Sequence, residues 1–250
     1  MTTTIENPSN PTTPTAPSAR VPMSPARRSA FYGGLFYLIT FASSIPAVFL
    51  LRPLLNDSHY IISSGADTQV VWGTILDLVN ALTAVGSAVA LYPVMKRQSQ
   101  SMALGFVSTR MFEAAVIAIG VISLLTVVSL RSPGSTGAEA DSLVLTQNAL
   151  VAAYNWVFLI GPNLMPAVNG ILLGTLMYKS GLVPKAIPLM GLVGGPLLLM
   201  VTIASMVGIT HHGSAWWIVA APVVFWEFSL GCYLTFKGYK PSPVTEGMDH

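Results

Sequence analysis

Apolar residues are concentrated in six long runs, which cover residues 30–51, 72–95, 103–130, 149–178, 187–209 and 215–236. A run of this length can cross a bilayer as an α-helix, because about 20 residues at a rise of about 1.5 Å each span a hydrocarbon core of about 30 Å. The pattern therefore predicts six transmembrane helices.

Composition agrees with this interpretation. Of the 250 residues, 52% are hydrophobic and 9% are charged, and the formal net charge is +2. Soluble domains carry about 25% charged residues, so this chain cannot build a water-facing surface of the usual kind. We predict an all-α integral membrane protein, a six-helix bundle over residues 27–241, with the lipid bilayer as its partner and no separate soluble domain.

The two ends of the chain differ from this apolar region. Residues 1–26 are rich in Pro, Thr and Ser and contain no apolar core, so we predict a disordered tail there. A signal peptide needs an apolar region of about 7 to 15 residues near its start, so the first helix is expected to act as its own insertion signal. Residues 242–250 are predicted to form a second, short tail.

Basic residues near the helix ends predict the orientation, because short cytoplasmic loops are enriched in Lys and Arg. One side of the predicted bundle carries Arg52 and Arg131. The other side carries nine basic residues, which are Arg20, Arg27, Arg28, Lys96, Arg97, Lys179, Lys185, Lys237 and Lys240. Both termini are therefore predicted to be cytoplasmic, in a multi-pass protein of the plasma membrane.

Glu227 is the most deeply placed acidic residue. It lies ten residues after Trp217 and ten before Lys237, about 15 Å from either end of its helix at the usual rise. A carboxylate at that depth should be neutral or paired, because desolvation disfavours its charged form. Glu227 is either a protonated side chain that joins two helices or a carboxylate that carries a proton or binds a cation.

Asp77 and Asn80 stand three residues apart, so together with Thr74 and Ala84 they share one face of the second predicted helix. A stripe of small and polar residues is typical of a helix face that is turned toward the interior of a membrane bundle. The stripe serves either helix packing or the lining of an outward-facing pocket.

The fourth run is interrupted by Pro162 and Pro166 and also contains Asn155, Asn163 and Asn169. Each proline removes a backbone donor and clashes with the preceding turn, which predicts a kink or break near the middle of this helix. Carbonyl groups freed in a membrane need new partners, and interrupted helices also form the binding sites of many transporters. The segment is therefore a candidate binding site, although proline is common in membrane helices.

The third run extends from Met102 to Leu130, about 43 Å of helix, which is longer than the hydrocarbon core. Arg110 is expected near the inner interface, where its long side chain can reach water, with Glu113 about 4.5 Å deeper. Arginine before glutamate is the less favourable order within a helix, so local helix stability does not explain the pair. We expect at least one of the two to bond to a different helix or to the hairpin between the fourth and fifth helices, as a clamp on the inner face of the bundle.

Several kinds of site have no signal in the chain. It lacks the H-E-x-x-H, G-x-S-x-G, P-loop and dinucleotide-binding motifs, and it has no cluster of His or Cys that would hold a metal, an iron–sulfur cluster or a haem. We expect no metal and no cofactor. The basic residues are spread along the predicted inner loops, as the topology requires, so nucleic-acid binding has no support.

Four segments of the chain resemble the bacterial membrane family called domain of unknown function 4386. These are "RRSAFYGGLFYLITFASSIPA", "RMFEAA", "YNWVFLIGPNLMPAVNGILLGTLMYKSGLVPKAIPLMGLVGGPLLL" and "WEFSLGCYLTFKGYKP". The resemblance covers about residues 27–241. The positions that match the family motifs are Arg110, Glu113, Asn169, Gly170, Gly174, Gly181, Leu182, Pro184, Gly191, Gly194, Gly195, Pro196 and Glu227. The resemblance implies a six-helix architecture and no particular reaction.

Three classes of function follow. The first is a non-enzymatic accessory or sensor protein of the membrane, because 250 residues with short loops leave little room for a gated pathway. The second is a small transporter or ion-coupled permease, in which Glu227 titrates and a small solute or ion is the partner. A membrane-embedded enzyme ranks third, because no nucleophile, base and orienting group occur together.

Overall fold

The structure, a computed structural model, describes residues 23–65, 67–210 and 214–248. These residues form the helices α1 (Pro25–Asn56), α2 (Asp67–Gln98), α3 (Gln100–Ser129), α4 (Gly137–Phe158), α5 (Met165–Ser180), α6 (Ala186–Met206) and α7 (Ser214–Phe236), with a short 3₁₀-helix η1 (Tyr60–Ile62) and a π-helix η2 (Leu159–Leu164). Since α4, η2 and α5 form one continuous segment, six helical segments are long and apolar enough to cross a membrane. The predicted all-α six-helix bundle is confirmed.

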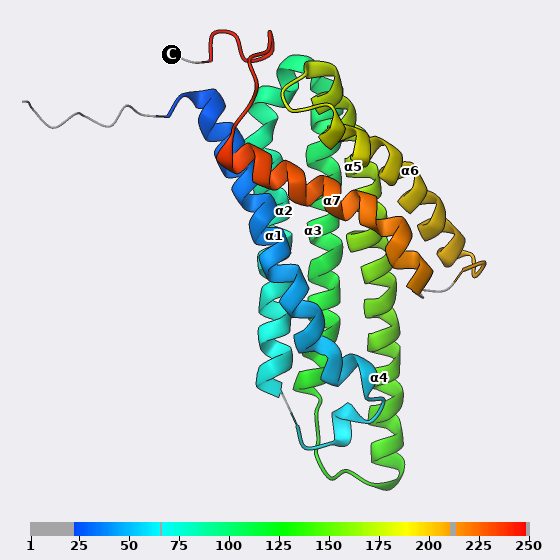
Figure 1. Cartoon of the computed structure of the whole chain (residues 1–250). Helices are drawn as coiled ribbons and strands as arrows, with labels where there is room; N and C mark the ends of the chain where they lie inside the picture. The colour runs from blue at the N-terminus through cyan, green and yellow to red at the C-terminus, as the bar shows by residue number, and fades with distance from the viewer. Residues whose placement is uncertain (1–22, 66, 211–213, 249–250) are drawn as a thin grey trace, which may run out of the picture.

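The long helices lie side by side, and α6 and α7 cross them obliquely (Figure 1). Helices α1, α2, α3 and the segment α4–α5 run along the length of the molecule. Helices α6 and α7 cover only the half that is nearer the chain ends, where the described ends of the chain lie together (Figure 1). We call this the termini end, and the end formed by η1 and the α3–α4 connection the loop end.

Most helices are longer than their apolar runs. Helices α1 and α2 have 32 residues each, about 48 Å at the usual rise. The fourth segment begins at Gly137, well before the expected residue 149. Its first turns are too polar to be recognised as part of an apolar run. They are held by the buried Gln147, whose side chain accepts a hydrogen bond from the backbone N of Ile61 at 2.7 Å and donates one to the carbonyl of Asp57 at 2.6 Å.

The predicted irregularity at Pro162 is confirmed as a π-helix rather than a break. Residues Leu159–Leu164 are π-helical, and α4 continues through them into α5. Proline has no N–H to donate, so the local helix widens. The amide of Asn163 donates to the carbonyl of Phe158 at 3.0 Å, which gives a freed backbone acceptor a new partner.

Glycines allow α7 and α6 to approach their neighbours closely. A β-carbon at Gly34 of α1 would lie 2.6 Å from the backbone N of Thr235 on α7, and one at Gly191 of α6 would lie 2.8 Å from the ring of Trp226. A β-carbon at Gly195 would lie 2.7 Å from the carbonyl of Ala167, so α5 and α6 pack as a close hairpin. The contacts at Gly34 and Gly191 bring α7 close to α1 and α6.

The termini end is closed by polar contacts. Arg27 of α1 donates to the carbonyls of Leu234 and Thr235 at 3.0 and 2.7 Å and so satisfies the C-terminal end of α7. Ser242 donates to the carbonyl of Ser180 at 2.7 Å, and Thr245 is buried. The part of the predicted second tail that the structure describes is therefore packed on the bundle, while residues 1–22, most of the first predicted tail, lie outside the described residues.

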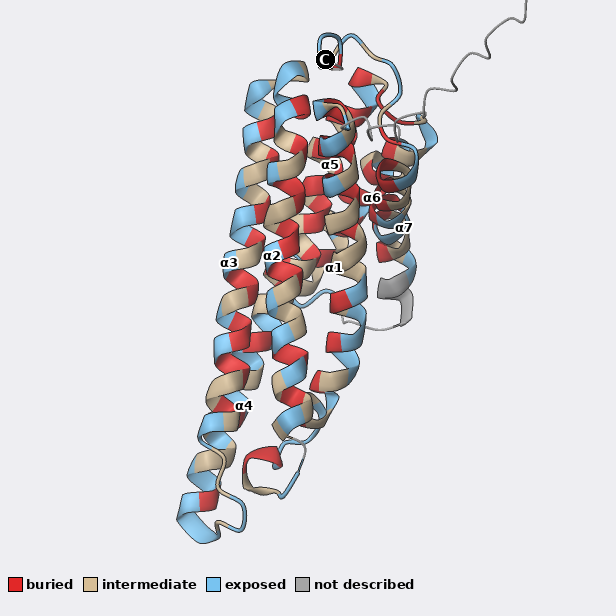
Figure 2. Cartoon of the chain, turned by 90° about the vertical axis from the view of Figure 1, so that its left-hand side faces the viewer, coloured by how far each residue is buried: buried red, intermediate tan, exposed pale blue. Residues whose placement is uncertain are grey.

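The buried apolar residues form two main clusters that flank the middle of the bundle. The larger one lies toward the termini end and includes Phe106, Trp226 and Leu230. A smaller one lies toward the loop end and includes Leu51 and Leu124. Buried residues gather on the helix faces that are turned toward one another (Figure 2). The two clusters include Tyr37 and Tyr154, respectively, which also contact the buried polar residues of the bundle.

Candidate functional site

Arg110 is the centre of a buried polar cluster that joins three helices. Its guanidinium lies 3.1 Å from a carboxylate oxygen of Glu113 on α3 and 2.5 Å from Oε1 of Glu227 on α7, and it donates to the hydroxyl of Tyr37 on α1 at 2.9 Å. Arg110, Glu113 and Glu227 are 1%, 5% and 8% exposed. The expectation that one member of the Arg110–Glu113 pair bonds to a different helix is confirmed.

The cluster corrects the expected depths of these residues. Arg110 was expected near the inner interface and Glu227 near the middle of the membrane, but their side chains are in contact. Arg110 lies about 15 Å along α3 from its start, and Glu227 lies about 13 Å along α7 from its end. Arg110 and Glu227 therefore share one depth, and the cluster that contains Arg110 and Glu113 also includes α7.

One guanidinium in this cluster faces two carboxylates, so the cluster carries one surplus negative charge when both carboxylates are ionised. The Glu113 carboxylate also accepts from the amide of Asn169 at 3.2 Å, and the hydroxyl of Thr109 donates to the carbonyl oxygen of that amide. The guanidinium carbon of Arg110 lies 5.0 Å from the ring centroid of Tyr37, close enough for a cation–π contact. Glu113 is therefore held by α3 and α5 together.

A cavity of about 460 Å³ lies beside this cluster and receives Glu227. Its polar lining residues are Ser44, Asp77, Asn80, Tyr154, Asn163 and Glu227. The remaining lining is apolar and comes mainly from α1, α4 and α7. This combination of an apolar wall with a few convergent polar groups is typical of a small-molecule binding site.

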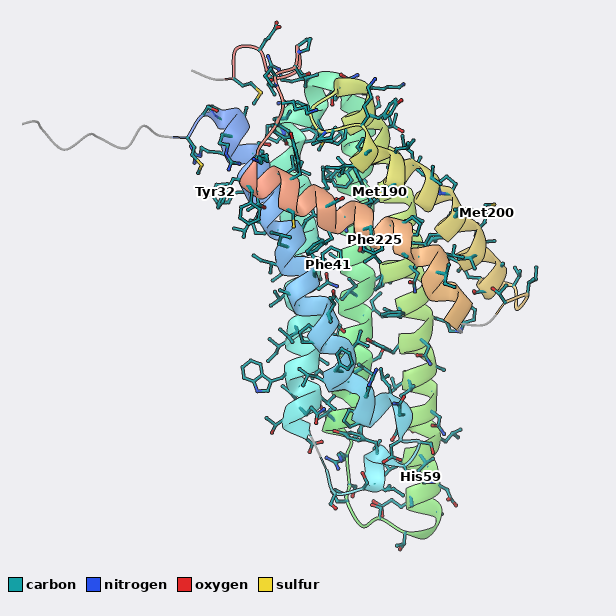
Figure 3. All side chains as sticks on the ribbon, viewed as in Figure 1. Tyr32, Phe41, His59, Met190, Met200 and Phe225 are labelled. Carbon is teal, nitrogen blue, oxygen red and sulfur yellow. The ribbon has the colours of Figure 1, made fainter. Side chains whose placement is uncertain are left out.

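Exposed apolar side chains of α1 and α7 are among the lining residues of the cavity. Among its lining residues, Ile45 of α1 is 54% exposed and Phe225 of α7 is 63% exposed. Figure 3 labels Phe41 on α1 and Phe225 on α7 where α7 passes over the bundle. Ile45 and Phe225 both belong to helical segments that are long and apolar enough to cross a membrane, so the edge of the cavity carries exposed apolar groups.

Asp77 and Asn80 reach the cavity from α2 with few partners of their own. The hydroxyl of Tyr154 donates to Asp77 over 3.4 Å, and no basic group of the described residues lies within ion-pair distance of this carboxylate. Asn80 is 8% exposed, and its side-chain amide has no hydrogen-bond partner among the described residues. Both side chains are therefore free to contact a molecule in the cavity.

The predicted site residues thus divide into three groups. Asp77, Asn80, Asn163 and Glu227 line one cavity, and Asn169 supports Glu113 from α5. Asn155 is exposed and lies outside the cavity, so its inclusion in the intramembrane site was wrong. Successive residues of an α-helix are rotated by about 100°, and at this turn of α4 it is Tyr154 that faces inward.

Tyr37 and Tyr154 are functional candidates that the sequence did not single out. Tyr37 bonds to Arg110, and Tyr154 lines the cavity and contacts Asp77. The only available signal was the phenol itself, because a buried tyrosine hydroxyl in an apolar helix usually has a polar partner. Several other tyrosines in the chain carry the same signal, so the sequence could not separate these two from the rest.

Comparisons with known proteins give a family and no activity. The family model "Domain of unknown function (DUF4386)" matches residues 32–238, so the chain belongs to this family. No curated protein and no solved structure matches the chain. Within the part of the chain that the structure describes, no three His, Cys, Asp or Glu residues are grouped so that they could hold a metal ion.

Proposed function

We propose that this member of the DUF4386 family is a non-enzymatic membrane protein that binds a small amphipathic molecule in the cavity between α1, α4 and α7, as a sensor or accessory protein would. The cavity itself carries the proposal. Its volume of about 460 Å³ falls within the range of about 300 to 1,000 Å³ that is usual for ligand pockets. The exposed Ile45 and Phe225 among its lining residues support entry from the bilayer rather than from water.

The two apolar clusters on either side of the cavity support a fixed binding site. Each packs large side chains such as Phe106 and Leu124 without exposure. Leu198, Ala220 and Val223 of the larger cluster and Tyr154 of the smaller one line the cavity, so part of its wall belongs to the packed core. A pre-formed site loses little conformational entropy when a ligand binds.

Photolabelling of the protein in lipid nanodiscs tests this proposal. The probe is 4-phenylbutanol with a photoreactive diazirine on its ring, and labelled peptides are identified by mass spectrometry. We expect labelling of residues 41–48 and 220–227, which line the cavity. Ala221→Trp, which fills the cavity, should abolish it, and Ala115→Trp on an exposed face of α3 should not. Equal labelling of both variants would contradict the proposal.

Transport is a second candidate, and a specific observation favours it. One cavity connects Glu227 with Asp77 and Asn163, and the cluster behind Glu227 has one carboxylate more than Arg110 can neutralise. Such a carboxylate can exchange a proton. Proton or small-solute flux into liposomes that is abolished by Glu227→Gln would support transport, whereas the absence of flux would leave the sensor or accessory proposal.

We also propose that both termini are cytoplasmic. The support is the excess of Lys and Arg at the termini end, where Arg27, Lys96 and Lys179 lie in terminal turns of α1, α2 and α5 and Lys237 directly follows α7. Alkaline phosphatase fused after residue 248 should be inactive in this orientation, because it folds only outside the cytoplasm. An active fusion would reverse the orientation.

A further inference from the structure

We infer that the ligand of the cavity is an organic cation, an apolar body that carries one ammonium group. This inference rests on the proposed function, because it names the ligand class of the same cavity. The lining residues of the cavity include two carboxylates, those of Asp77 and Glu227, and no Lys, Arg or His.

The charge of the cavity favours a cation. Arg110 can balance either Glu113 or Glu227 but not both, and Asp77 has no basic partner among the residues that the structure describes. A carboxylate without a partner in a low-dielectric region is costly. A monovalent cation in the cavity would offset this cost directly.

Two neutral amides, those of Asn80 and Asn163, also line the cavity. Asn80 as a whole is 8% exposed. The nitrogen of the Asn163 amide is engaged by the carbonyl of Phe158, so its oxygen is available as an acceptor. These amides offer polar groups that a molecule in the cavity can contact beside the two carboxylates.

The aromatic side chains of the cavity favour an organic cation. Phe41, Tyr154, Phe158 and Phe225 all line the cavity, and the rings of Tyr154 and Phe158 lie 6.4 Å apart with an interplanar angle of 32°. Aromatic faces attract cations, and quaternary ammonium groups are commonly bound by such rings. Apolar walls do not replace the hydration shell of a metal ion, which needs several oxygen ligands. The lining therefore favours an organic cation over an inorganic one.

Calorimetric titration in nanodiscs tests the inference with two matched probes. The cation is 4-phenylbutyltrimethylammonium, and its neutral carbon isostere is (5,5-dimethylhexyl)benzene; heats from empty nanodiscs are subtracted. We expect the cation to bind at least about tenfold more tightly than the isostere. Asp77→Asn and Glu227→Gln should each reduce this preference by about tenfold. Asp141→Asn and Glu139→Gln, which are exposed at the start of α4, should leave it unchanged.

The outcomes separate this inference from the proposed function. If both probes bind equally and Ala221→Trp abolishes both, the cavity binds ligands but its ligand is not a cation. If neither probe binds, or if Ala221→Trp blocks the binding of neither, the inference and the proposed function both fail. If one carboxylate variant does not fold, the other still tests the preference, and a preference unchanged by both would overturn the inference.

Discussion

Arg110 on α3 and Glu227 on α7 form a buried ion pair with 2.5 Å between Nη2 and Oε1, although 117 positions separate them along the chain. The pair connects α3 to α7, the last helix of the bundle. Tyr37 of α1 contacts the same guanidinium, so three helices depend on one side chain. The stability of the bundle and the charge of the cavity are therefore linked through Arg110.

Arg110→Ala should destabilise the protein by about 3 to 5 kcal/mol, because it leaves two buried carboxylates without their shared cation. The melting temperature in detergent, or the midpoint of unfolding in sodium dodecyl sulfate, measures this loss. Arg28→Ala is the matched control, since Arg28 is exposed on α1. An Arg110→Ala variant with the same melting temperature as the wild type would show that the ion pair does not stabilise the fold.

Glu113→Gln and Glu227→Gln should each be tolerated, because either one leaves a carboxylate opposite Arg110 and an amide that still accepts its hydrogen bond. The double variant leaves the guanidinium without a counter-ion. Its loss of stability should exceed the sum of the single losses by about 1 to 3 kcal/mol. A double-mutant cycle of unfolding free energies measures this excess, and simple additivity would mean that the two carboxylates do not share Arg110.

Gly34→Ala should destabilise the contact of α1 with α7 by about 1 to 3 kcal/mol, the usual cost of overpacking. Its new methyl group would lie 2.6 Å from backbone and side-chain atoms of Thr235. Gly105→Ala is the control, because its methyl group would meet Leu172 at an ordinary 3.5 Å, and alanine favours the helix. The two variants are compared by thermal unfolding in detergent, and equal stability would contradict a close contact at Gly34.

Asn163→Ala should cost about 1 to 3 kcal/mol, because the carbonyl of Phe158 loses the donor that replaces a helical hydrogen bond at η2. Asn155→Ala should change stability by less than about 0.5 kcal/mol, since Asn155 is exposed on α4. Unfolding midpoints of the two variants test this difference. Equal losses would indicate that the π-helix does not depend on the Asn163 amide.

The sequence by itself determined the helices and the residues that require an explanation. Six apolar runs predict six spanning helices because a bilayer permits few other structures. Glu227 and Asp77 were identified because a charge in an apolar run is costly wherever the helix packs. The irregularity at Pro162 followed from the missing N–H of proline, which no packing can restore. These conclusions rest on local chemistry and on the solvent alone.

Only the tertiary structure decided which of these residues meet. The Arg110–Glu227 pair depends on how α7 packs on the bundle, which includes a close contact with α1 at Gly34 that hydropathy does not encode. The division of Asn155 from Asn163 depends on the rotation of one helix, which the π-helical turn shifts away from the usual period. Helices that are apolar on every side can pack in several orientations, because lipid and protein offer similar surroundings to an apolar side chain. The cavity and its charge are therefore properties of the assembled bundle.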